Sequence, residues 1–259
     1  MLNRLYAIIL RQLYVFVASL GRSSDTLFWP VVNLFLWGYL SIYFSQKGGI
    51  NLLASLLTGY LLWMFLQRSQ EDLSVGLLED LWSRNFINIF ATPITIWEYL
   101  LGLITTGCLK LLGSFFLVVI LTYLLFAFNI FSLGIYLVPF IFNLLLTGWW
   151  TGIMINGLII RFGFEVEALS WTMIFLLMPF SGVFYPVDVL PTWMQTISYI
   201  LPSSYVFSGM RKLIQDGIFD WNLFVVSLIL NIFFMLLSLL FYKKMFDIAK
   251  EKGYLVKNY

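Results

Sequence analysis

The sequence predicts an all-α membrane protein that crosses the bilayer several times. Of its 259 residues, 61% are hydrophobic and only 11% are charged, and its mean hydropathy is +0.92. A soluble domain has about 45–50% apolar and about 25% charged residues, and its surface must face water. The composition therefore excludes a cytosolic enzyme, a nucleic-acid-binding protein and a disordered segment. The apolar runs are continuous instead of alternating, which predicts spanning helices and not barrel strands.

Six segments are long and apolar enough to cross about 30 Å of hydrocarbon, which takes about 20 residues of helix. The predicted spans are approximately 27–44, 50–66, 99–126, 133–160, 168–185 and 223–242. We expect all of them to belong to one membrane domain that comprises residues 1–259.

Residues 1–22 form a separate predicted element at the start of the chain. Arg4, Arg11 and Arg22 share one helical face, and the rest of the segment is mostly apolar. This pattern predicts an amphipathic helix that lies along the membrane surface. A signal peptide is the alternative, but the arginines recur and no small-residue cleavage site follows a clean apolar core.

The distribution of basic residues predicts the orientation in the membrane. With six spans, both chain ends lie on the same side. When that side is the cytoplasm, eleven of the 15 Lys and Arg residues lie there, and only Lys47, Arg211 and Lys212 lie outside. We therefore expect both termini in the cytoplasm.

The connection 67–97 is a long cytoplasmic loop in this topology. Leu77, Leu78 and Leu81 have helical spacing beside acidic residues, which predicts an amphipathic helix that rests on the membrane or docks into a partner. A solvated connector is the alternative. Neighbouring carboxylates such as Glu79 and Asp80 point about 100° apart on a helix, so they predict no catalytic pair.

The same connection ends on a predicted helix start. Pro93 breaks the chain, Thr95 is a predicted N-cap of the third span, and Glu98 is its partner in a capping box.

The external connection 186–222 is interrupted by prolines. Pro186 ends the fifth predicted span, and Asp188 is expected to cap a short helix that has Pro191 in its first turn. Pro202 is expected to end that helix and to start another. Both pieces are too short to cross, so they predict re-entrant or interfacial helices that cover a pathway.

The external run SGVFYPVDVLPTWMQTISYILPSSYVFSGMR closely resembles the signature of ABC transporter permeases of the type-two exporter class, which includes drug, O-antigen and teichoic-acid exporters. The stretch ATPITIWEYLLG resembles the family's entry into the third span, and the resemblance extends to the basic tail KKMFDIAKEKGYLVKNY. Many members carry a Glu a few residues before Pro93, where this chain has Ile87 and Asn88.

The resemblance implies an ATP-driven exporter in which two permease copies, identical or different, form the pathway above two ATPase subunits. ATP and Mg²⁺ bind those partners, so no cofactor is expected in this chain. The chain has no G-x-x-x-x-G-K-[ST] phosphate loop, which independently predicts a separate ATPase. The residues expected to couple to the ATPase are Glu79, Asp80, Trp82, Arg84, Arg161 and Glu165. Those expected at an external gate are Phe184, Tyr185, Pro186, Asp188, Pro191 and Pro202.

The residue inventory argues against chemistry in this chain. There is no His, and the single cysteine, Cys108, lies in an apolar run, so neither a His-based triad nor a metal cluster is expected. The chain is therefore expected not to be an enzyme.

A few polar and small residues lie inside the predicted spans. Lys110 is expected to face a pathway or to snorkel to the interface. Gly148 and Gly152 form a G-x-x-x-G pattern that predicts close helix packing. The residues expected to hydrogen-bond between helices are Asn33, Gln70, Asn143 and Asn156.

We therefore expect an exporter subunit in the plasma (inner) membrane, in contact with its lipids. A stand-alone secondary transporter or channel and a membrane scaffold are the alternatives. A lipid-linked glycan, a lipid and a hydrophobic drug are all compatible substrates. The 19% aromatic content is explained by interfacial belts, although some rings, Trp37 and Trp63 among them, are expected to face the pathway.

Overall fold

The computed structural model describes residues 2–48 and 50–253, without the side chains of residues 20, 22, 23, 25, 47, 48, 50 and 51. The predictions that concern Arg22, Lys47 and Lys257 therefore lie outside the described residues. All regular secondary structure in the described ranges is helical, which confirms the all-α prediction.

The helices follow one another with short connections. In chain order they are α1 (Leu2–Ala18), α2 (Leu20–Gly48), α3 (Ile50–Trp82), α4 (Phe86–Phe90), α5 (Ile96–Phe126), η1 (Ile130–Tyr136), α6 (Leu137–Phe162), η2 (Gly163–Val166), α7 (Leu169–Ser181), η3 (Val187–Val189), α8 (Thr192–Ser198), α9 (Pro202–Asp216) and α10 (Trp221–Glu251).

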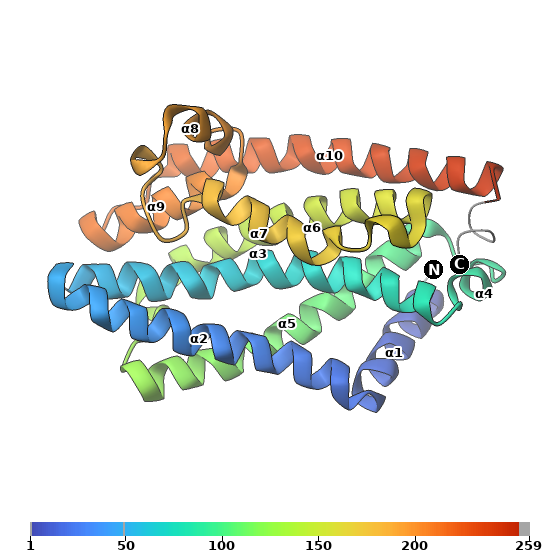
Figure 1. Cartoon of the computed structure of the whole chain (residues 1–259), viewed down its shortest axis with the longest axis horizontal. Helices are drawn as coiled ribbons and strands as arrows, with labels where there is room; N and C mark the ends of the chain where they lie inside the picture. Colours follow the sequence, from blue (N-terminus) through green and yellow to red (C-terminus); the bar gives the residue numbers. More distant parts are fainter. Residues whose placement is uncertain (1, 49, 254–259) are drawn as a thin grey trace.

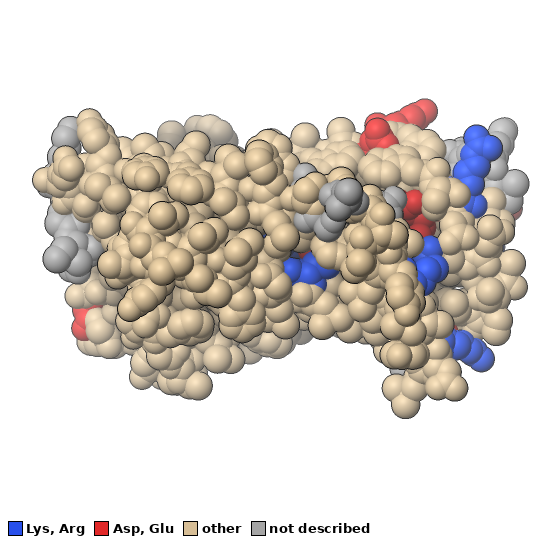
Figure 2. All heavy atoms as spheres, turned by 90° about the horizontal axis from the view of Figure 1, so that it is seen from below, with Lys and Arg blue, Asp and Glu red and all other residues tan. Residues whose placement is uncertain are grey.

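The long helices run side by side along the molecule, with α3 in the centre against α2, α5 and α6 (Figure 1). The helices α1 and α4 and the last turns of α10 lie at one end, here called the α4 end. The helices α8 and α9 lie at the other, the α8 end. On the face drawn in Figure 2, most charged side chains gather toward the α4 end.

Four described stretches are long and apolar enough to cross a membrane. They are Thr26–Gln46, Ile96–Phe126, Ile130–Val166 and Trp221–Glu251. The predicted span 168–185 is wrong in extent, because α7 ends at Ser181, where Gly182 takes a left-handed conformation with φ of 61°. Its 13 residues reach about 20 Å. Four of the six predicted spans therefore have the length and composition to cross.

The prediction of a loop that starts at residue 67 is also wrong, because α3 continues without a break to Trp82. Leu73, Leu77 and Leu78 are at most 1% exposed, so this part of the helix is surrounded by protein. The helix ends where Arg84 adopts a φ of 52° and the amides of Arg84 and Asn85 bond back to Leu81 and Asp80, both at 2.9 Å. This is a Schellman motif, in which glycine is the usual residue at the left-handed position.

Two glycines let α6 approach α3 closely. A Cβ atom on Gly148 would lie 1.9 Å from Ser69 Oγ and 2.6 Å from the carbonyl oxygen of Leu66. One on Gly152 would lie 3.0 Å from Leu73. The predicted packing role of the G-x-x-x-G pattern is confirmed, and the surface it contacts is α3 of the same chain.

A fully buried polar network joins α6 to α10. Asn231 Nδ2 donates to the backbone and side-chain oxygens of Asn143, both at 3.0 Å. Asn231 Oδ1 accepts from Thr147 at 2.9 Å and from the indole of Trp150 at 3.1 Å. The hydrogen-bonding role predicted for Asn143 is confirmed. It also holds for Asn156, which donates to Leu73 O at 3.1 Å, and for Gln70, which donates to Ser170 O at 3.1 Å.

Replacement of Asn231 by leucine should destabilise the protein, because the buried indole N–H of Trp150 would lose its acceptor and Thr147 and Asn143 would each lose a hydrogen bond. We expect a loss of about 1–3 kcal/mol in the free energy of unfolding, measured by thermal unfolding in detergent. Asn222→Leu, at the exposed start of the same helix, is the control. Equal unfolding midpoints for the two variants would contradict the role of the network.

Candidate functional site

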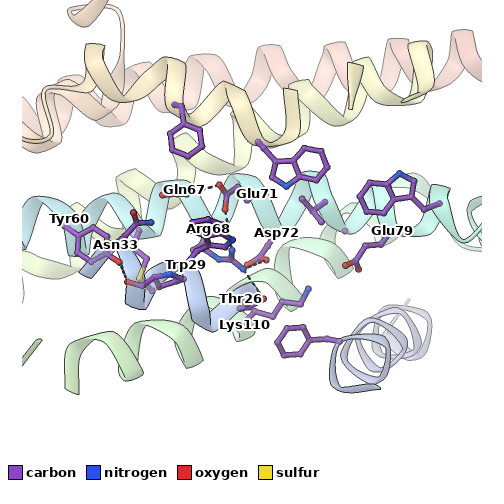
Figure 3. Close-up of a pocket in the computed structure, with 18 residues that line it drawn as sticks. Thr26, Trp29, Asn33, Tyr60, Gln67, Arg68, Glu71, Asp72, Glu79 and Lys110 are labelled. Carbon is purple, nitrogen blue, oxygen red and sulfur yellow. Dashed lines mark hydrogen bonds and ion pairs between the residues drawn. The ribbon is translucent and has the colours of Figure 1, made fainter. Parts of the chain in front are cut away.

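A cleft of about 730 Å³ follows α3. Its walls come from α2 on one side and α7 on the other, and α1 and α5 contribute Phe16 and Lys110 (Figure 3). The cleft thus collects side chains from helices far apart in the sequence.

The character of the cleft changes along α3. Toward the α8 end its walls are mostly apolar and aromatic, with Tyr60 and Met64 facing Trp29 and Pro30. One turn further come Gln67, Arg68, Glu71 and Asp72. Toward the α4 end, Trp82 stacks on Trp171 with ring centroids 6.2 Å apart. The cleft therefore has an apolar half and a charged half.

A proline shapes the α2 wall. Pro30 lies inside α2 and has no N–H, so it cannot bond the carbonyl of Thr26 four residues earlier. Ser114 of α5 supplies the missing donor and bonds Thr26 O at 3.2 Å, while Tyr60 of α3 donates its hydroxyl to Pro30 O. The interrupted helix is thus held by both neighbours, as buried backbone in a membrane requires.

The charged half is organised by Arg68. Its guanidinium lies 2.9 Å from Asp72 and 3.4 Å from Glu71, and it donates to Thr26 Oγ1 at 3.2 Å. Gln67 donates to Glu71 at 2.9 Å. The second oxygen of Asp72 is buried and has no hydrogen-bond partner among the described residues. A buried, ion-paired arginine costs free energy of desolvation unless its hydrogen bonds are satisfied, and Arg68 is 6% exposed.

Lys110 reaches the cleft from α5. Its ammonium lies 5.0 Å from the centroid of the Phe16 ring on α1, a cation–π contact. The structure therefore places Lys110 in the cavity, as one of its two predicted alternatives requires.

The other two residues predicted to face a pathway, Trp63 and Trp37, do not line this cleft. Trp63 is 2% exposed and packs in the core beside Phe207, with ring centroids 6.2 Å apart. Trp37 stacks on Phe184 at 3.4 Å. Neither of these described side chains lines the cleft. Arg68, Glu71 and Trp171 line it instead. Arg68 and Glu71 were not predicted to do so because the segment after residue 66 was expected to be a loop, and Trp171 lies on α7.

Two of the predicted coupling residues are buried. Glu79 lines the cleft, and Asp80 lies inside the bundle at 3% exposure. Asp80 accepts from Arg11 of α1 at 2.6 Å, from Gln12 at 3.1 Å and from the Tyr99 hydroxyl of α5 at 2.7 Å. The carboxylate of Asp80 therefore joins α1, α3 and α5.

The remaining predicted coupling residues lie near the surface of the α4 end. Trp82 is 47% exposed and donates its indole N–H to Glu167 at 3.2 Å. Arg84 and Glu165 are exposed. Arg161 is half-buried, with its guanidinium 5.0 Å from the Phe162 ring and 3.6 Å from the sulfur of Met245.

The short helix α4 was not predicted as a separate element, yet it forms much of this surface. Its own residues Phe86 and Ile89 are buried on the inner side of the helix, and the Phe86 ring packs edge-on against Tyr99. Ile87 and Asn88 face outward. A hydrophobic anchor with polar neighbours at a break between long helices is the signal that could have identified it.

The entry into α5 is held on both sides. The predicted capping box is confirmed, since Glu98 N donates to Thr95 Oγ1 at 3.2 Å and Thr95 N donates to Glu98 at 2.9 Å. Arg4 of α1 donates to the carbonyl of Pro93 at 2.6 Å. The segment between α4 and α5 is thereby tied to α1.

The predicted gate residues surround the turn between α7 and α8. Tyr185 donates to Pro179 O at 2.9 Å, and Arg211 of α9 donates to Gly182 O. Phe184 is half-buried, and Pro186 and Pro191 are exposed. Pro202 is buried at the first turn of α9, as predicted.

The capping role predicted for Asp188 is wrong. Asp188 lies inside η3, is exposed, and the N-cap residue of α8 is Pro191. Asp220 is the described acidic cap in this region, and it accepts from the amides of Asn222 and Leu223 at the start of α10. The hydrogen bond from Lys212, together with those amides, lowers the pKa of Asp220.

Loss of the Asp80 carboxylate should loosen α1, because Arg11, Gln12 and Tyr99 would all lose their acceptor. We expect Asp80→Ala to reduce the free energy of unfolding by about 1–3 kcal/mol, measured by thermal unfolding in detergent. Asp247→Ala, on the exposed side of α10 at the same end, should have little effect. Indistinguishable unfolding of the two variants would show that the carboxylate is not structural.

The comparisons with known proteins agree with this architecture. No curated protein matches the chain. The family model of the ABC-2 type transporters matches residues 5–214, from the first turn of α1 to the last turn of α9. This match covers more than half of the sequence and confirms the resemblance seen in the external run. The chain belongs to the family of ABC-2 type transporters.

Proposed function

We propose that the chain is the membrane subunit of an ATP-driven exporter, and that separate ATPase subunits bind its α4 end. The observation that carries this proposal is α4 itself. It is a five-residue helix at a break between two long helices, anchored by buried rings and exposed on its outer face. A rigidly anchored projection of this kind can pass a push from a partner into α3 and α5.

The surface proposed to couple to the ATPase consists of α4 and its neighbours. Ile87 and Asn88 form its centre, and the exposed residues Trp82, Arg84 and Glu165 extend it. Arg161 is half-buried next to this surface. Asp80 and Glu79 act from within the bundle, where Asp80 transmits movement between α1, α3 and α5 through the hydrogen bonds described above.

The charge distribution supports the proposed orientation. Arg4, Arg11, Arg84 and Arg161 lie near the α4 end, whereas Arg211 and Lys212 lie near the α8 end. By the positive-inside rule the α4 end faces the cytoplasm, where ATP is available. The protein is then a subunit of the plasma (inner) membrane with both termini in the cytoplasm and with α8 and α9 outside.

The cleft is the proposed substrate pathway of one subunit. Two copies, or this chain and a second permease, would enclose it. Its apolar and charged halves suit a lipid, a lipid-linked glycan or a hydrophobic drug, which would leave past the predicted gate between α7 and α9. The six crossings of this proposal require α3 and α7 to cross together with the four apolar stretches.

A stand-alone secondary transporter or channel is the second candidate. It is favoured by the ionisable residues that line the cleft, Arg68, Asp72 and Lys110, because such residues inside a membrane bundle mark ion and substrate pathways. Dependence of transport on ATP in proteoliposomes that hold the chain with its ATPase distinguishes the two candidates.

The first test addresses the α4 surface. Two cations on its outer face, Ile87→Lys with Asn88→Lys, should weaken co-purification of the ATPase from mild detergent by about tenfold, because they place uncompensated positive charge in the contact, with unchanged thermal unfolding. Val189→Lys, exposed at the α8 end, is the control. Absence of an ATPase from the wild-type preparation, or full retention by the double variant, would contradict the proposal.

Arg84 offers a second test that separates backbone from side chain. Its left-handed conformation favours glycine, so Arg84→Gly should raise the free energy of unfolding by about 1 kcal/mol. If the guanidinium contacts the ATPase, the same variant should bind the ATPase more weakly. A variant that is more stable and binds the ATPase as well as the wild type does would remove Arg84 from the coupling surface.

A further inference from the structure

Lys110 lies in the stretch Ile96–Phe126, which is long and apolar enough to cross a membrane, and it forms no ion pair with the described Asp and Glu side chains. It lies 15 residues after the Thr95 cap of α5, which places it about 22 Å along the helix. Among the described residues, no Asp or Glu oxygen lies within 4 Å of its ammonium, and the ring of Phe16 is its close neighbour. A cation–π contact compensates only part of the cost of removing an ammonium from water.

Two carboxylates of the cleft pair with Arg68 and not with Lys110, although one oxygen of Asp72 has no hydrogen-bond partner among the described residues. Glu71 and Asp72 share the guanidinium of Arg68, and Glu71 also accepts from Gln67. Glu79 lies further toward the α4 end, and its side chain interacts with a group other than Lys110. Figure 3 shows these carboxylates on α3, with Lys110 approaching from α5. An anion beside Lys110 would neutralise it, while the nearby carboxylates would repel a highly charged one.

The apolar half of the cleft indicates that the anionic group is attached to an apolar part of the same molecule. Met64, Pro30 and Phe175 line it toward the α8 end, next to the rings of Tyr60 and Trp29. The volume of about 730 Å³ lies in the range of ligand sites, roughly 300–1,000 Å³. A bound molecule would thus place its polar head at Lys110 and its apolar part toward the α8 end.

From this geometry we propose that the cleft binds an amphipathic molecule with a singly charged anionic head, a phosphate or a carboxylate, and that Lys110 pairs with that head. This inference rests on the exporter function proposed above and names the substrate class of its cleft. Such a molecule would enter with the orientation of a lipid in the leaflet nearest the α4 end. Lys110 is a specificity-determining residue in this proposal.

Binding to the full-length chain in detergent tests the proposal. The probes are dioleoyl phosphatidylglycerol, dioleoyl phosphatidylcholine and a dioleoyl trimethylammonium lipid, which share their tails and differ in head charge. We expect the wild type to bind phosphatidylglycerol about tenfold more tightly than the other two. Lys110→Met should abolish this preference and leave phosphatidylcholine binding unchanged.

Two further variants make the test specific. Lys110→Arg keeps the charge and should retain most of the preference, and Lys244→Met, which removes an exposed cation from α10, should behave as the wild type. Inorganic phosphate at the lipid concentration should not compete. Equal binding of the three lipids, tighter binding of the cationic lipid, an unchanged preference in Lys110→Met or efficient competition by phosphate would each overturn the proposal.

The same preparations separate this inference from the proposed function. Co-purification of the ATPase is measured on the wild type and on Lys110→Met. If the ATPase is retained and the lipid preference is absent, the inference about the anionic head fails and the exporter proposal stands. If no ATPase accompanies the wild type, the exporter proposal fails whatever the lipids show.

Discussion

Burial of a partly polar helix in the centre of an apolar bundle is the constraint on which the other features of this protein depend. The helix α3 carries Arg68, Asp72 and Asp80 at exposures of 9% or less. In surroundings that offer little water, each of these charges needs a partner from the chain itself. Arg68 finds Asp72 one turn away on α3, while Asp80 recruits Arg11 from α1 and Tyr99 from α5. These partnerships determine where α1 and α5 pack.

The close approach of backbones is the complementary constraint. Helices in lipid associate through packing and hydrogen bonds, since burial of apolar surface gains little there. Gly148 brings α6 onto the backbone of α3, and the Asn143–Asn231 network locks α10 onto α6. These contacts therefore hold α3, α6 and α10 together. The helices α1 and α7 contribute side chains to the cleft beside α3, and α4 lies at the α4 end.

Much of the fold could be predicted from local patterns. Apolar runs located α5, α6 and α10. The predicted capping box placed the N-cap of α5 at Thr95, where the structure has it, whereas the apolar run alone placed the start of the span three residues too late, at residue 99. The continuity of α3 could not be predicted in this way, because the charges after residue 66 resemble those of a solvated loop. They are helical and buried because other helices, distant in sequence, supply their partners. The length of α7 was missed for the opposite reason, since the apolar run continues past the turn at Gly182.

The sequence by itself determined that the protein is helical, that it belongs in a membrane, and that its external run is that of an ABC-2 type transporter. Composition, periodicity and a local motif are sufficient for those conclusions. Only the tertiary structure decided which charged residues line the cleft, that Asp80 is a structural acceptor, and that α4 is the exposed element at its end. Each of these depends on contacts between residues tens of positions apart, and such contacts arise from packing that no local pattern specifies.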